Sequence, residues 1–127
     1  YFRLAISGTF QTANYLSQYT YFNGASPAGV IDASTFAIIL NGGGVSNDAS
    51  EGGMSGELLL TKPSDTSTYK RVTGQLSYAD ATIAESSVVS VMGYYGGATS
   101  AINGIRVLAS SGNLTSGKVH IYGIKSS

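Results

Sequence analysis

Short apolar runs in which every second residue is hydrophobic recur along this chain, and clusters of Gly, Asn and Ser separate them. Phe2, Leu4 and Ile6, for example, alternate with Arg3, Ala5 and Ser7. A period of two is typical of β-strands with one buried face, and few stretches of ten residues have helical periodicity. The pattern predicts strands over residues 2–7, 15–22, 35–40, 56–62, 69–78, 87–95, 102–110 and 118–124.

About eight strands in 127 residues, with turn-rich joints, predict a single all-β domain over residues 1–127, an antiparallel β-sandwich of jelly-roll type. An immunoglobulin-like sandwich is the alternative, although the chain has no Cys or Trp for the hallmark of that fold. Two long connections, residues 23–34 and 42–55, interrupt the strands. We expect Val30 and Ile31 to turn inward, and the Gly-rich second connection to be a flexible surface loop or a functional one.

Charge and composition exclude several classes of protein. Seven basic and seven acidic residues give zero net charge, so the chain has no electrostatic footprint for nucleic acid. The absence of Cys excludes disulfides, thiolate metal sites and Cys catalysis. No apolar run approaches the roughly 20 residues of a membrane span. The chain begins at Tyr1 rather than Met, and we expect it to be processed or part of a longer polypeptide.

Catalytic patterns are weak. A Ser-His-Asp site would have to form around His120, the single His, and no G-x-S-x-G elbow occurs. The carboxylates stand alone among turn residues, and we expect solvated turn roles for Asp32, Asp48, Asp65 and Asp80. Asp48 and Glu51 lack the spacing of a calcium loop. The sequence therefore predicts a protein that is not an enzyme, with no catalytic residue, no metal and no cofactor.

The aromatic residues are more informative, because the chain has nine Tyr and no Trp. Tyr has a flat apolar face and a polar tip, which suits sugar stacking and protein interfaces alike. Tyr94 and Tyr95 end a strand beside two Gly residues, and core packing, partner contact and glycan contact are all open for them. With Asn47 and Asp48 of the Gly-rich connection, they are the candidate ligand-binding residues.

Three predicted strands are apolar on both faces: residues 36–40, 58–60 and 88–91. A free monomeric sandwich would have polar outer faces. We therefore expect other chains to cover some of these faces, as in an oligomer or a packed particle.

The C-terminal third resembles a module of tailed-phage virion proteins. In that group an A-I-N-x-I strand, an S-G-N-hydrophobic-x-S-G hairpin and a terminal hydrophobic-Y-G-hydrophobic strand recur in this order. The matching residues are 100–107, 111–117 and 119–124, and residues 21–24 and 62–70 are similar to upstream parts of the module, with Lys62 in place of its first Asn. The Gly and Asn residues of this motif also have the backbone freedom that a tight hairpin needs.

The resemblance implies a β-sandwich located in the virion, in a tail fibre, a tail spike or a head-decoration or head-fibre protein. The function we expect from it is non-enzymatic attachment to a host-surface glycan, in a homotrimer. The alternative is a structural capsid decoration or head-fibre protein that binds other virion chains. A glycan hydrolase or esterase is a third hypothesis, which the scattered carboxylates disfavour.

Overall fold

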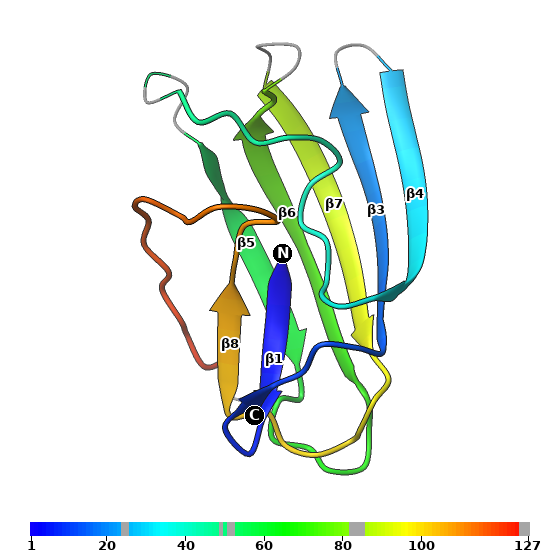
Figure 1. Ribbon diagram of the computed structural model, residues 1–127. Helices are drawn as coiled ribbons and strands as arrows, with labels where there is room; N and C mark the ends of the chain where they lie inside the picture. The colour runs from blue at the N-terminus through cyan, green and yellow to red at the C-terminus, as the bar shows by residue number, and fades with distance from the viewer. Residues whose placement is uncertain (24–25, 49, 51–52, 82–85, 125–127) are drawn as a thin grey trace.

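The computed structural model describes the chain except for residues 24–25, 49, 51–52, 82–85 and 125–127, and for residues 23, 26–28 and 30–35 it describes the backbone alone. The described chain contains no α-helix, and its strands form two antiparallel sheets (Figure 1). The strands are β1 (Phe2–Ile6), β2 (Thr9–Phe10), β3 (Tyr15–Asn23), β4 (Ser26–Thr35), β5 (Met54–Thr61), β6 (Lys70–Ala79), β7 (Ser86–Tyr95) and β8 (Gly104–Val107).

The two sheets face each other as a β-sandwich. The smaller sheet has the order β2-β1-β8, and the larger one has the order β4-β3-β7-β6-β5. In the larger sheet, β5, β6 and β7 follow one another as a meander, and the β3–β4 hairpin joins the free side of β7. The predicted all-β class is confirmed, whereas the jelly-roll connectivity stays a prediction.

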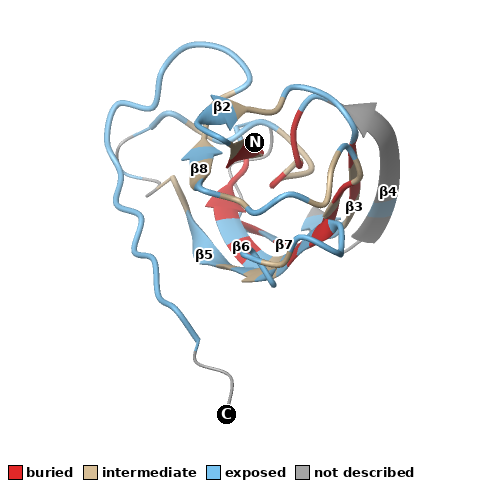
Figure 2. Cartoon of the chain, turned by 90° about the horizontal axis from the view of Figure 1, so that it is seen from below, coloured by how far each residue is buried: buried red, intermediate tan, exposed pale blue. Residues whose placement is uncertain are grey.

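The core lies between the sheets, where the buried residues gather in Figure 2. β1 contributes Phe2 and Leu4, and β7 contributes Val89 and Val91 from the opposite side. Each such side chain stabilises the fold by roughly 1.5–3 kcal/mol when it is fully buried. Alternation along β7 is strict, because its residues are exposed and buried in turn from Ser86 to Gly93. The period-two interpretation of this strand is therefore confirmed.

Two predictions for residues 23–40 are wrong. The expected loop over 23–34 contains β4, which pairs along β3 from Asn23 to Tyr15, so Asp32 lies in a strand rather than a turn. Of the expected strand over 35–40, Thr35 ends β4, and residues 36–40 belong to neither named sheet. This segment crosses between the sheets, and Ile38 exchanges two backbone hydrogen bonds with Phe2, at 2.8 and 2.9 Å. Ala37, Ile38 and Leu40 are buried between the two layers, whereas Phe36 is exposed and its ring packs against that of Tyr1. The inward placement expected for Val30 and Ile31 concerns side chains outside the described part.

The Gly-rich connection is a packed part of the sandwich at its start. A Cβ on Gly42 would collide with the ring of Tyr21, and one on Gly43 would collide with the carboxylate of Asp80. Ser46 N–H donates to the Ala79 carbonyl at 2.8 Å, which ties the segment to the end of β6. Gly42 and Gly43 therefore have no room for a side chain where the segment passes close to the sheet, whereas Gly44 and Val45 are exposed. The expectation of a flexible loop stays a prediction.

The C-terminal prediction is also wrong in part. The strand expected over 102–110 is shorter, β8, and residues 118–124 form no strand. Every described residue from Ser110 to Ile124 is exposed. A strand requires a neighbouring backbone to supply its hydrogen bonds, and none lies alongside this segment in the described chain. Gly112 does adopt the left-handed conformation expected of the motif, with a φ of +69°.

A buried lysine fixes the end of the sandwich where β6 begins. Lys70 is fully buried, and its Nζ donates to the carbonyl oxygens of Asp65, Thr68 and Thr99, the last two at 3.0 Å. An ammonium group has three donors, and here each one has an acceptor. The lysine thereby joins the β5–β6 turn to the segment that follows β7.

Candidate functional site

The outer face of the larger sheet, which points away from the core, carries a mixed set of side chains. Strand registers place side chains from β3, β7 and β6 in neighbouring rows on this face. The first row is Leu16, Tyr94 and Arg71, and the second is Gln18, Met92 and Thr73. Aromatic, cationic, amide and thioether groups from three strands therefore meet on one patch of sheet.

These two rows enclose a shallow hollow, which we call the outer-face groove. Its volume is about 160 Å³, below the roughly 300–1,000 Å³ of enclosed small-molecule pockets. A groove of this size holds one ring or one side chain of a partner rather than a whole ligand. Its lining residues are Leu16, Gln18, Arg71, Thr73, Met92, Gly93 and Tyr94.

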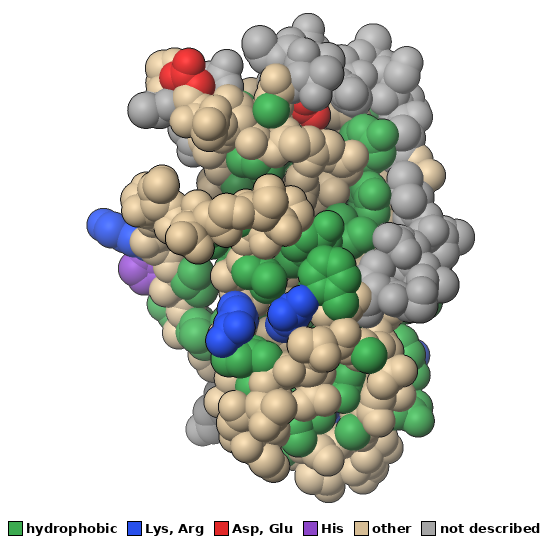
Figure 3. All heavy atoms as spheres, in the orientation of Figure 1, with side chains coloured by type: hydrophobic (Ala, Val, Ile, Leu, Met, Phe, Trp, Pro, Cys, Tyr) green, Lys and Arg blue, Asp and Glu red, His purple; other side chains and the backbone are tan. Residues whose placement is uncertain are grey.

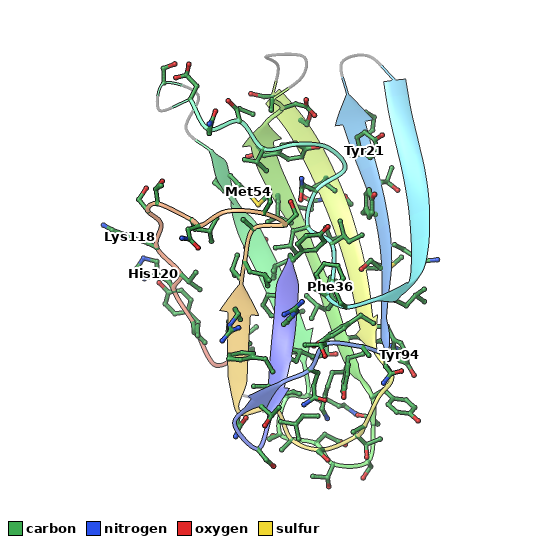
Figure 4. The ribbon with its side chains drawn as sticks, in the orientation of Figure 1. Tyr21, Phe36, Met54, Tyr94, Lys118 and His120 are labelled. Atoms are coloured by element: carbon green, nitrogen blue, oxygen red, sulfur yellow. The ribbon has the colours of Figure 1, made fainter. Side chains whose placement is uncertain are left out.

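Tyr94 dominates one end of the groove. It is half-buried, and its ring meets the ring of Tyr69 edge-on, with centroids 5.5 Å apart and an interplanar angle of 69°. This contact restricts the orientation of the Tyr94 ring before anything binds. Figure 4 shows the residue at the end of β7, where its side chain projects from the sandwich. Arg71, its cross-strand neighbour, is exposed. An aromatic ring beside a guanidinium can combine stacking with charged hydrogen bonds.

Tyr95, the second Tyr predicted to bind a ligand, lies on the inner face and is buried. Its ring packs against Tyr15 with centroids 5.0 Å apart, and its hydroxyl donates to Gln11 Oε1 at 3.1 Å. Burial raises the pKa of this hydroxyl above its usual value. Of the three roles left open for the Tyr pair, the structure gives core packing to Tyr95 and a surface position to Tyr94.

Asn47 and Asp48 are exposed, but they lie far from Tyr94. Val45, two residues before Asn47, forms a bridge with Asp80 at the end of β6, next to the beginning of β7. Tyr94 is at the other end of β7, and a ten-residue strand spans roughly 30 Å. The four predicted ligand-binding residues are therefore not brought together at one site.

The carboxylates that the structure describes have different settings. Asp48 Oδ1 accepts from the Oγ and N–H of Ser50, and these bonds lower the pKa of the carboxyl group. Asp65 Oδ1 accepts from the N–H groups of Ser67 and Thr68, which lower its pKa likewise. Both confirm the expected hydrogen bonding of turn carboxylates to nearby backbone.

Asp80 departs from that expectation, because its exposed fraction is 3% and a solvated role is wrong for it. Glu51 lies outside the described residues, and so does Glu85.

His120, the single His, is exposed, and its ring stacks on that of Tyr122, with centroids 6.4 Å apart. No group of three or more His, Asp or Glu side chains that could hold a metal ion occurs in the described part of the chain.

Sequence reasoning missed most of the groove. Alternation along residues 69–78 does place Arg71 and Thr73 on one side of their strand. It does not reveal that Tyr94 lies between Arg71 and Leu16, because that depends on the registers of β6, β7 and β3. A correct pairing of these strands would have been enough to assemble the groove.

No protein-family model, no curated protein and no solved structure matches this chain. In the described residues no helix is long and apolar enough to cross a membrane.

Proposed function

We propose that this domain is a non-enzymatic attachment module of a phage virion, which binds a host-surface glycan through the outer-face groove. The observation that carries the proposal is the position of Tyr94, which lies beside Arg71 at the end of the groove. A sugar ring stacks on a flat aromatic face, and its hydroxyl groups accept from or donate to nearby polar side chains. Gln18 and Thr73 supply such groups in the same hollow.

The shallowness of the groove sets the expected strength of binding. A hollow that holds a single ring gives weak affinity at each site, so useful attachment requires several sites acting together. The homotrimer expected from the resemblance would supply them. The virion setting itself is supported by the C-terminal sequence motifs alone.

Binding to a glycan array, with the domain coupled in several copies to a carrier, tests the proposal. We expect specific glycans to bind, and Tyr94→Ala to reduce their apparent affinity at least about tenfold, since a central aromatic contact contributes on the order of 2 kcal/mol. Tyr122→Ala is the matched control, because Tyr122 has an exposed fraction of 82% and lies outside the groove. Failure of the multivalent domain to bind any glycan, or equal binding by both variants, would contradict the proposal.

A structural virion protein is the second candidate, and the exposed apolar residues of the larger sheet favour it. On its outer face Phe22 and Val88 face each other across strands β3 and β7, and their exposed fractions are 50% and 48%. Leu59 and Met92, at 48% and 56%, flank Thr73 on the same face. Other virion chains could cover this surface.

The position of the domain in purified particles separates the two candidates. Density for the labelled domain at a fibre tip would favour attachment, and density on the capsid lattice would favour decoration.

Screening the same chain for glycan-degrading activity tests the third hypothesis, that the domain is a glycan hydrolase or esterase. If activity were found and His120→Ala or any carboxylate substitution abolished it, the domain would be an enzyme.

A further inference from the structure

The chain leaves the sandwich after β8 and carries apolar side chains into solvent. Leu108 is the last described residue with a backbone hydrogen bond to the sandwich, from its N–H to the Tyr1 carbonyl at 3.0 Å. We call residues 118–124 the C-terminal segment. Its exposed fractions include 63% for Val119, 75% for Ile121 and 81% for Ile124. Figure 2 shows this end of the chain running away from both sheets.

The C-terminal segment has the alternating side chains of a strand, although it pairs with none among the described residues. The rings of His120 and Tyr122 lie nearly parallel, with an interplanar angle of 17°. Side chains two residues apart share a side only when the backbone is extended, as in a β-strand. Val119 and Ile121 alternate with these rings in the sequence, which gives the segment one aliphatic and one polar-aromatic side. Figure 4 shows Lys118 and His120 on the outer side, and Figure 3 shows the His side chain at the edge of the molecule.

The sandwich has an open edge that fits such a strand. β8 pairs with β1 on one side and has no strand on its other side among the described residues. The smaller sheet is narrower than the larger one, and β5 lies on the same side of the molecule as β8 (Figure 1). Leu58 and Leu60 of β5 pack against the core but remain only partly buried. A further strand beside β8 would widen the smaller sheet over these leucines.

We propose that the C-terminal segment of one copy of this chain adds as a strand to the β8 edge of a second copy. Val119 and Ile121 would then cover the half-buried leucines of β5, and His120 and Tyr122 would face solvent. Strand addition of this kind satisfies the backbone groups of both partners. The donor and the acceptor belong to the same chain, so reciprocal exchange produces a closed symmetric assembly.

A second copy, rather than the chain's own β8, is the occupant that the structure favours. No backbone hydrogen bond joins the segment to the described residues of its own sandwich, and the segment extends away from both sheets. The connection from 109 to 117 is nine residues, with a reach of up to about 30 Å, which is enough for a neighbouring molecule. The proposal does not depend on glycan binding, because the outer-face groove contains no residue of β8 or of the C-terminal segment.

The mass of the chain in solution, measured by sedimentation, tests this exchange. We expect an oligomer for the full chain and a monomer for a chain that ends at Gly117. Ile121→Asp places a charge on the aliphatic side and should give a monomer. His120→Asp, the matched control, places the same charge on the solvent side and should leave the oligomer intact. Far-ultraviolet circular dichroism of each variant verifies that the sandwich has folded.

Amide hydrogen exchange identifies the acceptor. Protection of residues 119–123 that rises with protein concentration supports exchange between copies. Protection that is independent of concentration would mean that the segment pairs with its own β8, and the absence of protection would mean that it pairs with nothing. Either result would overturn the proposal, as would an oligomer that persists in the shortened chain. Neither result bears on Tyr94, whose test uses the glycan array.

Discussion

The two faces of β7 have similar hydrophobic residues and different surroundings. On the inner face, Val89 and Val91 have exposed fractions of 0% and 2%, because β1 and the crossing segment at Ile38 lie over them. On the outer face, Val88 and Met92 are about half exposed, at 48% and 56%. Side-chain hydrophobicity alone therefore does not distinguish a core position from a surface one in this strand. Whether a residue of β7 is buried depends on whether a second layer packs against its face of the sheet. The outer-face residues therefore contribute little to the folding of a single chain.

The largest expected effect comes from placing one charge on each face of β7. Val89→Asp buries an unpaired carboxylate in the core, and we expect it to lower the free energy of unfolding by more than about 4 kcal/mol. Domains of this size have roughly 5–15 kcal/mol in total, so this variant should be largely unfolded or have a much lower melting temperature. Val88→Asp should change stability by less than about 1 kcal/mol. Thermal unfolding followed by circular dichroism measures both, and similar losses would show that something covers the outer face.

The second comparison is between two adjacent basic residues of β6, the buried Lys70 and the exposed Arg71. Lys70→Met removes the ammonium group that three carbonyl oxygens surround, and we expect a loss of about 3 kcal/mol, since bonds to a charged donor are the strong ones. Arg71→Met changes a cation on the outer face, next to Tyr94, and its effect on stability should stay within about 0.5 kcal/mol. Urea unfolding of both variants gives the two free energies. Equal losses would mean that Lys70 does not fix this end of the sandwich.

The alternation of residues was enough to predict most of the larger sheet. Strands β3, β5, β6 and β7 lie where the pattern places them, within two residues at each end. The failures have two physical causes. Strand β4 was not predicted, because it contains Gly29 and Pro27, which are uncommon in strands. It nevertheless pairs along the whole of β3. Residues 36–40 have a strand-like pattern but meet β1 at a single bridge, from Ile38 to Phe2, and residues 118–124 have no adjacent strand among the described residues. Pairing is not encoded in a local pattern.

The candidate site was less predictable than the fold. Tyr94 and Tyr95 are adjacent in sequence, but alternation sends one to each face, and only the position of the smaller sheet determines which one is buried. Lys70 is in phase with Val72 and Leu76, so alternation places it on the buried face, but a charged side chain at the start of a strand is normally solvated. Its burial depends on two loops that approach it from residues 65–68 and 99.

The smallest expected effect concerns a position on β7 with no side chain. A Cβ on Gly93 would lie 2.5 Å from Cδ1 of Ile38, so Gly93→Ala should cost about 1–2 kcal/mol through overpacking. Gly29→Ala in β4 is the matched control, since no atom lies within 4 Å of its added Cβ, and its stability should be unchanged or slightly higher.

Ile38→Ala removes all three atoms that would lie within 2.8 Å of that Cβ, and it should cost less in the Gly93→Ala background than alone, where it leaves a cavity. Urea unfolding of the single and double variants measures this coupling. Additive losses would mean that the crossing segment does not press on the inner face of β7 at Gly93. In that case, the inner face of β7 would be tightly packed only at the positions that carry a side chain, and not at Gly93.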